Sequence, residues 1–359
     1  MKNVLEWLEA TVAKYPDKPA FSDTESSITF RQVYDIARNT GAYLVEQLGV
    51  DRTPVAVFAG RKMVTPAYFL GVVYAGRPYA PIDASLPDKR IEKILENLCP
   101  RAIVADRESR EHVESIVDEL AKAEGFDRPQ IFIAEDISHF EQVACADSNC
   151  KISESSGDAV TDSENDTDGG VVAGCAGKTD DSALEKLATV RRQMSMTDPL
   201  YIIYTSGSTG NPKGVMTSHL SLMTYINAYC DVMHIEESDV LGNQSPLDYI
   251  AAIRDIYLPL KTGCSTAIIP KEYFMEPNAL FDYMNDKKVS SVGWSVSAFT
   301  ILTSLGAFEE VGLKSLRKIC FSGSVMPCRV LRKWQENLPE AHFVNQYGPT
   351  EATASCTYY

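Results

Sequence analysis

The stretch that decides the fold of this chain is a loop in its second half, Tyr204-Thr205-Ser206-Gly207-Ser208-Thr209-Gly210-Asn211-Pro212-Lys213-Gly214-Val215. It directly follows residues 200–204, an apolar run that predicts a buried strand. Thr205 to Gly214 includes three glycines, four hydroxyl side chains and one lysine. Glycines let backbone N–H groups turn toward one point, hydroxyls add donors, and the lysine adds a mobile positive charge. The loop is therefore suited to hold a polyphosphate.

Composition alone does not separate this interpretation from a flexible Ser/Gly hairpin. Two familiar phosphate-binding loops are excluded. No G-x-x-x-x-G-K-[ST] sequence occurs, so the loop is not a Walker A loop. No G-x-G-x-x-G occurs either, so it is not a dinucleotide fingerprint.

Strands and helices alternate around this loop. Leu5, Leu8 and Val12 repeat at helical spacing, and Thr29-x-x-Gln32 is a capping box that predicts the start of a second helix. Alternation of this kind predicts βαβ units, and hence an α/β fold with layered sheets flanked by helices. Further strands are expected at 54–59, 79–83, 101–106, 265–269, 318–321 and 342–344. One helix should end near 71–76, and others are expected after Pro87, at 220–233 and at 254–260.

The alternation stops at residues 146–181, which are rich in Ser, Thr, Gly and Asp and contain no aromatic residue. From Asp147 to Asp181 there are nine acids against two lysines. Such a segment buries too little apolar surface to offset the entropy of ordering it. We predict a disordered acidic surface insertion, with a functional acidic tether as the alternative.

Composition bounds the function classes. The 359 residues carry a net charge of −15, which argues against nucleic-acid binding and against docking on anionic lipid. No apolar run approaches the roughly 20 residues of a membrane span, and the N-terminus does not read as a signal peptide. Nine cysteines without a C-x-x-C pair, and five histidines without zinc spacing, favour a reducing cytoplasm.

The loop at 204–215 resembles, almost letter for letter, the signature loop of the AMP-forming adenylate synthetases. This superfamily includes acyl-CoA synthetases, luciferases and the adenylation domains of peptide synthetases. Residues 345–353, Asn-Gln-Tyr-Gly-Pro-Thr-Glu-Ala-Thr, resemble its second core motif, and residues 321–327 and 71–83 resemble shorter elements. The resemblance covers nearly the whole chain except the acidic segment. It is nearest to the amino-acid-activating branch, including D-alanine–carrier-protein ligases, and implies the large N-terminal AMP-binding domain.

The resemblance implies activation of a small carboxylic acid by ATP and Mg²⁺, and transfer of the acyl group to the phosphopantetheine thiol of a carrier protein or to CoA. Four residues would be catalytic: Thr205, Lys213, Thr350 at the α-phosphate, and Glu351 as the Mg²⁺ ligand. Tyr347 would stack on adenine. His219 would be either a structural helix-start residue or a ligand contact. The implied nucleotide-binding residues are Thr205, Ser206, Gly207, Ser208, Thr209, Gly210, Lys213, Ser322, Gly323, Ser324, Asn345, Gln346, Tyr347, Gly348 and Thr350.

The acid pocket departs from the family pattern. Amino-acid-activating relatives carry an Asp that pairs with the substrate ammonium, and an ungapped alignment places Ile250 there. Either a local shift brings Asp248 into that role, or the acid lacks an α-amino group or holds it differently. We favour an atypical carboxylic acid. Arg254 would pair with a second acidic group on the substrate, or would face Asp255 or solvent. Trp294 would flank the acyl group or lie in the core. The implied pocket residues are Asp248, Tyr249, Ile250, Ala251, Arg254, Trp294, Cys320, Ser322, Gln346, Ala354 and Ser355.

In relatives the chain continues past the second motif, through a further subdomain to a small lid domain. None of these elements is found before Tyr359. We therefore expect residues 1–359 to form the large domain, incomplete at its C-terminal end, with little turnover alone. Two alternatives to a carrier-protein ligase stay open: an acyl-CoA synthetase, and a non-catalytic nucleotide-binding protein that has lost its lid.

Overall fold

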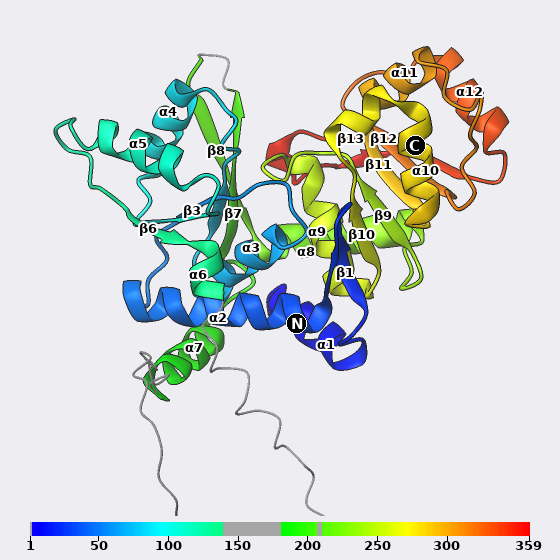
Figure 1. Ribbon diagram of the computed structural model, residues 1–359. Helices are drawn as coiled ribbons and strands as arrows, with labels where there is room; N and C mark the ends of the chain where they lie inside the picture. Colours follow the sequence, from blue (N-terminus) through cyan, green and yellow to red (C-terminus); the bar gives the residue numbers. More distant parts are fainter. Residues whose placement is uncertain (1, 139–180, 207–209) are drawn as a thin grey trace, which may run out of the picture.

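The computed structural model describes residues 2–138, 181–206 and 210–359, and this part of the chain forms two sheets side by side (Figure 1). The strand orders are β6-β5-β3-β4-β7-β8 and β14-β13-β12-β11-β9-β10-β1-β2. Most neighbours are parallel, but β7–β8, β1–β2 and β13–β14 are antiparallel. The bounds are β1 (Pro19–Ser22), β2 (Ser27–Thr29), β3 (Val55–Phe58), β4 (Tyr79–Pro81), β5 (Ala102–Ala105), β6 (Gln130–Ile133), β7 (Pro199–Ser206), β8 (Pro212–Ser218), β9 (Val240–Asn243), β10 (Ser265–Ile268), β11 (Ser291–Ser295), β12 (Lys318–Ser322), β13 (His342–Tyr347) and β14 (Thr357–Tyr358).

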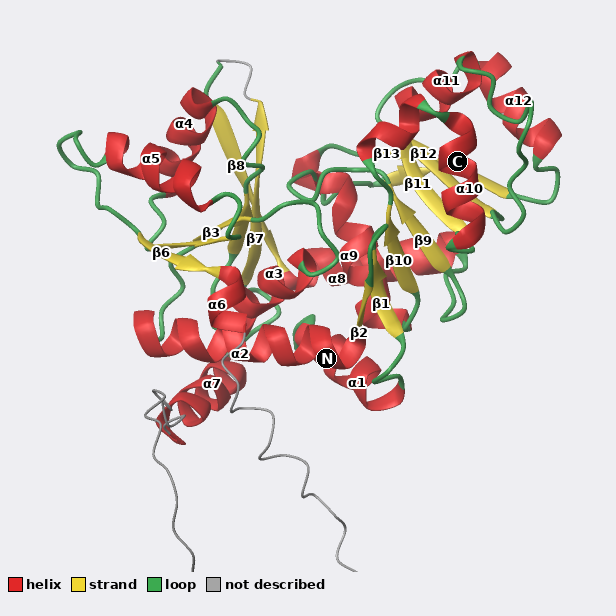
Figure 2. Cartoon of the chain, viewed as in Figure 1, coloured by secondary structure: helices red, strands yellow, loops and turns green. Residues whose placement is uncertain are grey.

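Helices cover both faces of each sheet (Figure 2). The first sheet packs one face on α4 (Asp88–Leu98) and α5 (Arg110–Leu120). A central core lies against its other face and is formed with α1 (Leu5–Lys14), α2 (Phe30–Leu48), α3 (Thr65–Tyr74), α8 (His219–Met233) and α9 (Ile253–Thr262). The second sheet has its outer core against α10 (Pro277–Asp286), α11 (Val296–Ser304) and α12 (Cys328–Asn337). The remaining helices are α6 (Ala134–Ser138), α7 (Asp181–Gln193), η2 (Ile250–Ala252), η3 (Lys271–Met275) and η4 (Thr350–Ala352).

Strand β3 shows why the sequence folds into these layers. Its four residues are all buried, and they alternate between two cores. Val55 and Val57 face the central core, while Ala56 and Phe58 pack against α4 and α5. Successive side chains of a strand point to opposite faces, so a continuous apolar run is the pattern of a strand covered on both sides.

The predicted α/β class with layered sheets flanked by helices is confirmed, as is the capping box at the start of α2. Thr29 Oγ1 accepts from the backbone N–H of Gln32 at 3.2 Å, and Gln32 Oε1 accepts from that of Thr29 at 2.9 Å. Strand β8 is not predicted from the sequence, because its residues form neither an apolar run nor a regular alternation. The predicted acidic insertion at 146–181 lies, apart from Asp181, outside the described residues.

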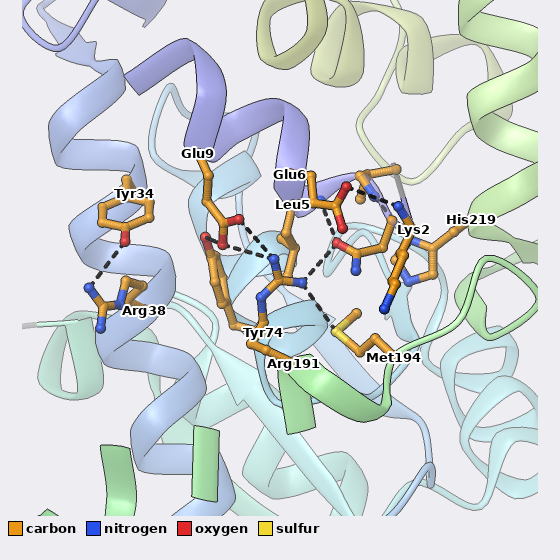
Figure 3. Close-up of polar contacts among 12 residues, drawn as sticks. Lys2, Leu5, Glu6, Glu9, Tyr34, Arg38, Tyr74, Arg191, Met194 and His219 are labelled. Carbon is orange, nitrogen blue, oxygen red and sulfur yellow. Dashed lines mark hydrogen bonds and ion pairs between the residues drawn. The ribbon is translucent and has the colours of Figure 1, made fainter. Parts of the chain in front are cut away.

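A half-buried ion pair between Arg191 and Glu9 fixes helix α7 to the rest of the protein (Figure 3). The Arg191 guanidinium donates to both carboxylate oxygens of Glu9 at 2.9 Å and to Asn3 Oδ1 at 2.8 Å. Tyr74 donates its hydroxyl to the same Glu9 carboxylate at 3.1 Å. These contacts tie α7 to α1 and α3. No helix among the described residues has the length and apolarity to cross a bilayer.

Candidate nucleotide and acid site

The glycine-rich loop lies at the turn of the β7–β8 hairpin, so the strand that precedes it returns antiparallel. Thr205 is directly opposite Lys213 in this pairing, which places both side chains on one face of the hairpin. Thr205 Oγ1 donates to the Lys213 carbonyl at 3.4 Å, and the Lys213 side chain is exposed. Ser206 and Gly210 are also exposed, and Gly210 has a φ of +77°. Gly207, Ser208 and Thr209 lie outside the described residues.

The turn end of this hairpin is held against α4. Tyr204 donates its hydroxyl to Asn97 Oδ1 at 2.8 Å, and Lys93 Nζ donates to Asn211 Oδ1 at 3.2 Å. A Cβ on Gly214 would lie 3.1 Å from the Tyr204 ring, so glycine lets that ring lie across β8. The predicted loop is therefore presented from a braced pair of strands.

The second motif forms a closed loop between β13 and β14. Gly348 permits the closure, since a Cβ there would lie 2.5 Å from the Cα of Ser355. Thr353 and Ala354 have φ values of +56° and +73°, a region that residues with a Cβ seldom adopt. Ser355 donates its hydroxyl to Gln346 Oε1 at 3.1 Å. Consecutive strained residues at one loop are typical of functional sites.

The two motifs lie close together. Helix η4, which contains Thr350 and Glu351, lies beside β8 of the glycine-rich hairpin. Glu351 is exposed and Thr350 is half-buried. Tyr347 is 70% exposed at the end of β13, which leaves its ring open for stacking, and Asn345 on the same strand is exposed as well.

The turn after β12 lies next to the second motif, because β12 and β13 are parallel neighbours with Phe321 opposite Asn345. Ser322 ends β12, Gly323 has a φ of +95°, and Ser324 is exposed. The carboxyl ends of parallel strands meet at one edge of a sheet, where α/β proteins bind ligands. The structure thus brings all three predicted nucleotide-binding segments to neighbouring positions.

The predicted acid-pocket residues divide between the two faces of the second sheet. Cys320 and Val344 pack in the central core, and by the two-residue period Ser322 and Gln346 face the same way. Trp294 packs in the outer core on the opposite face, 1% exposed, and donates its indole N–H to the Gly242 carbonyl at 2.8 Å. The structure therefore places Trp294 in the core, which is one of the two positions expected for it.

The side chain of Arg254, from α9, lies against the face of the second sheet that carries Cys320, and Arg254 is 3% exposed. A Cβ on Gly293 would be only 2.2 Å from Arg254 Nε, so the guanidinium packs directly against the backbone of β11. The nearest carboxylate is Asp255, with Oδ1 3.4 Å from Nε. Burial alone would lower the pKa of Arg254, but Asp255, Tyr229 and Tyr225 outweigh it and raise that pKa above its usual value.

Most of the other pocket candidates belong to or border the central core, whereas Asp248 lies elsewhere. Ile250 is buried in the central core, Ala354 packs against the same core, Ala251 is half-buried, and Tyr249 is 55% exposed. Asp248 instead lines a cavity of about 900 Å³ between the sheets, which also contains Arg61 and Asp83. Burial, and then the charge of Asp83, raise the pKa of Asp248. Arg254 does not line that cavity, so the structure places Asp248 and Arg254 in separate surroundings.

The residues present fit a magnesium ion only together with a nucleotide. The described residues contain no group of three His, Cys, Asp or Glu side chains arranged to hold a metal. Mg²⁺ is commonly held by one or two carboxylates with substrate phosphates and water. A single exposed carboxylate, Glu351 beside the glycine-rich hairpin, matches that donor set.

His219 belongs to the packing of the N-terminus. It begins α8, is 1% exposed, and accepts a hydrogen bond at Nδ1 from the backbone N–H of Val4 at 3.4 Å (Figure 3). Burial lowers the pKa of His219 to about 4, so the ring is neutral at pH 7. Of the two roles expected for it, this is the structural helix-start role.

With this arrangement described, comparisons with known proteins identify the class. The model of the AMP-binding enzyme family matches residues 8–359, and the chain belongs to this family. A D-alanine–D-alanyl carrier protein ligase of Bacillus cereus is 27% identical over 355 residues, which are 99% of this chain and 60% of that protein. The chain thus spans about 60% of the length of such relatives.

Solved structures agree on the fold. The N-terminal domain of FACL13 from Mycobacterium tuberculosis, solved with an inhibitor, superimposes with a TM-score of 0.73 at 19% identity, over 100% of this chain and 78% of that one. The nonribosomal peptide synthetase FmoA3 in its AMPPNP-bound form gives a TM-score of 0.75 at 19% identity, over 99% of this chain and 32% of that one. The predicted large N-terminal domain of this superfamily is thereby confirmed as the fold.

Proposed function

We propose that the protein activates a carboxylic acid with ATP, forming an acyl-adenylate and releasing pyrophosphate. The observation that supports this proposal is the proximity of β8 in the glycine-rich hairpin to η4, since the hairpin carries Thr205 and Lys213 and η4 carries Thr350 and Glu351. Donors on the hairpin would neutralise the triphosphate, and Mg²⁺ held by Glu351 would polarise the phosphoryl oxygens. Tyr347 would bind the adenine ring by stacking. In this proposal residues 1–359 act as one large nucleotide-binding domain.

The acyl acceptor in this proposal is the phosphopantetheine thiol of a carrier protein. The support is the name of the Bacillus cereus relative, which is a carrier protein ligase, and the match to a peptide synthetase. Because a free CoA thiol offers the same chemistry, an acyl-CoA synthetase is the second candidate. The cysteines described are all free thiols, which is compatible with action in the cytoplasm.

Nucleotide binding by this chain is the first test. Titration of ATP in the presence of Mg²⁺ should show binding that weakens about tenfold or more when Lys213→Ala removes the hairpin cation. Lys271→Ala, which removes an exposed lysine outside the three nucleotide-binding segments, should change the affinity little. Equal affinities in all three proteins would contradict the proposed nucleotide site.

Turnover is the second test. In the full-length protein, ATP–pyrophosphate exchange across a panel of carboxylic acids should be stimulated by a small subset of them. Loading of a carrier protein, as opposed to release of acyl-CoA, then separates the two acceptors. Binding of ATP without exchange for any acid would instead support the non-catalytic alternative.

A further inference from the structure

The surroundings of Arg254 contain two buried polar atoms without a hydrogen-bond partner, Arg254 Nε and the hydroxyl of Tyr225. Both residues are more than nine-tenths buried, with exposed fractions of 3% and 7%. Both lie beside Tyr229, whose ring centroid is 5.9 Å from Arg254 Cζ and 6.0 Å from the centroid of the Tyr225 ring. A buried donor without an acceptor is costly, so two neighbouring donors mark a place suited to an acceptor group.

The charge balance around Arg254 points to an anionic acceptor. Asp255 is the carboxylate nearest to Arg254, but it also faces Arg61 and receives a hydrogen bond from Asn243 Nδ2 at 2.9 Å. Arg61 donates to the Asn243 and Ile269 carbonyls, at 2.7 and 2.6 Å. The exposed Glu272 also faces Arg61. A single buried carboxylate, that of Asp255, is thus shared by the guanidinium groups of Arg254 and Arg61.

The position of Arg254 connects these donors to the acid site. It shares a sheet face with Cys320, and Ser322 and Gln346 continue that face toward the two motif loops. Ile250, which precedes Arg254 by four residues and lies in the same core, carries no charge. A substrate ammonium here would meet a buried cation and no carboxylate of its own, at a high desolvation cost. A carboxylate here would receive donors from both Arg254 and Tyr225.

We propose that Arg254 and Tyr225 bind a second carboxylate on the substrate, so that the acid activated is a short dicarboxylic acid. The inference rests on the proposed acid activation and specifies its substrate class. The acid has to be short because the side chain of Arg254 already extends from α9 to the backbone of β11. Arg254 is in this view a specificity-determining residue.

The test uses sulfamoyl adenosines, stable mimics of an acyl-adenylate, that differ only at the far end of the acyl group. Succinyl, succinamoyl and 4-aminobutanoyl forms present a carboxylate, a neutral amide and an ammonium. Calorimetric titration of this chain should show the succinyl form binding about 10- to 100-fold more tightly than the succinamoyl form, as expected for a charge-assisted pair. The 4-aminobutanoyl form should bind most weakly.

Substitutions of Arg254 and Tyr225 test whether these two residues produce the preference for the succinyl form. Arg254→Met should abolish the preference for succinyl over succinamoyl, Arg254→Lys should restore part of it, and Tyr225→Phe should reduce it. Tyr201→Phe is the matched control, because the Tyr201 hydroxyl is also buried without a partner but lies in the Tyr79–Tyr257 cluster. If Arg254→Met does not fold, Tyr225→Phe and Arg254→Lys still decide.

The outcomes separate this inference from the function on which it rests. If the three forms bind the wild-type protein equally, or the control variant loses the preference as much as Tyr225→Phe does, the dicarboxylic acid is wrong and acid activation stands. If none of the three binds, the proposed adenylate site itself is wrong.

Discussion

At the scale of single residues, Glu351 is the carboxylate on which the proposed use of magnesium depends. Glu351→Gln keeps the size of the side chain and removes its charge. We expect the affinity for ATP in the presence of Mg²⁺ to fall about tenfold or more, and the affinity in EDTA to change little. Glu336→Gln, on the exposed side of α12, is the control and should behave as wild type in both titrations. A loss that is equal with and without Mg²⁺ would argue against a metal-binding role.

Gly348 is the residue whose missing side chain lets the second motif close on itself. In Gly348→Ala, the new Cβ would lie 2.5 Å from Ser355 Cα and 2.8 Å from the Ala354 carbonyl oxygen. Backbone atoms have to move, and we expect a loss of about 1–3 kcal/mol in unfolding free energy together with weaker ATP binding. Gly312→Ala, where a Cβ would meet nothing within 4 Å, should change neither measurement.

At the scale of secondary-structure elements, the capping box of α2 gives a local prediction. Thr29→Ala removes the acceptor for the backbone N–H of Gln32. Denaturant unfolding should show a loss of about 1 kcal/mol, the usual cost of an N-cap exchange, and Thr29→Ser should recover most of it. An unchanged midpoint in Thr29→Ala would mean that tertiary packing alone fixes this helix start.

Elements also differ in how well the sequence foretells them. Strands such as β3 and β5 are buried on both faces, so their apolar runs are visible in the sequence. Strand β8 has neither an apolar run nor a regular alternation of polar and apolar residues, and it is specified by pairing with β7 across the glycine-rich turn. The sequence could therefore reveal the loop but not the hairpin that presents it, because pairing depends on a partner strand rather than on local pattern.

At the scale of the whole molecule, His219 connects the N-terminal segment to the strands and helices around the site. The folded-state pKa of about 4 lies below the ordinary 6.5, so the unfolded chain takes up the proton first as the pH falls. The contribution of His219 is complete above about pH 6.5 and is lost progressively toward pH 4, by about 3 kcal/mol in all.

The measurement is the unfolding free energy between pH 7 and pH 4, with His219→Gln compared to wild type. The variant should lose less stability over this interval than wild type does. Parallel slopes in wild type and His219→Gln would show that the ring is not held neutral by burial.

The sequence by itself determined the class of this protein, because its signals are local. The glycine-rich loop, the 345–353 motif and the alternation of strands and helices each depend on neighbours along the chain. It also placed Arg254 among the acid-pocket candidates, and left open whether that arginine faces Asp255, solvent or substrate.

Only the tertiary structure decided how these residues share space. It buried Arg254 against Gly293 beside the unpartnered hydroxyl of Tyr225, and it turned Trp294 to the opposite face of the sheet. It also separated Asp248 from Arg254, because Asp248 lines a cavity that Arg254 does not reach. The physical reason is that burial and charge compensation arise from strands and helices far apart in sequence, whose register and packing no local pattern specifies.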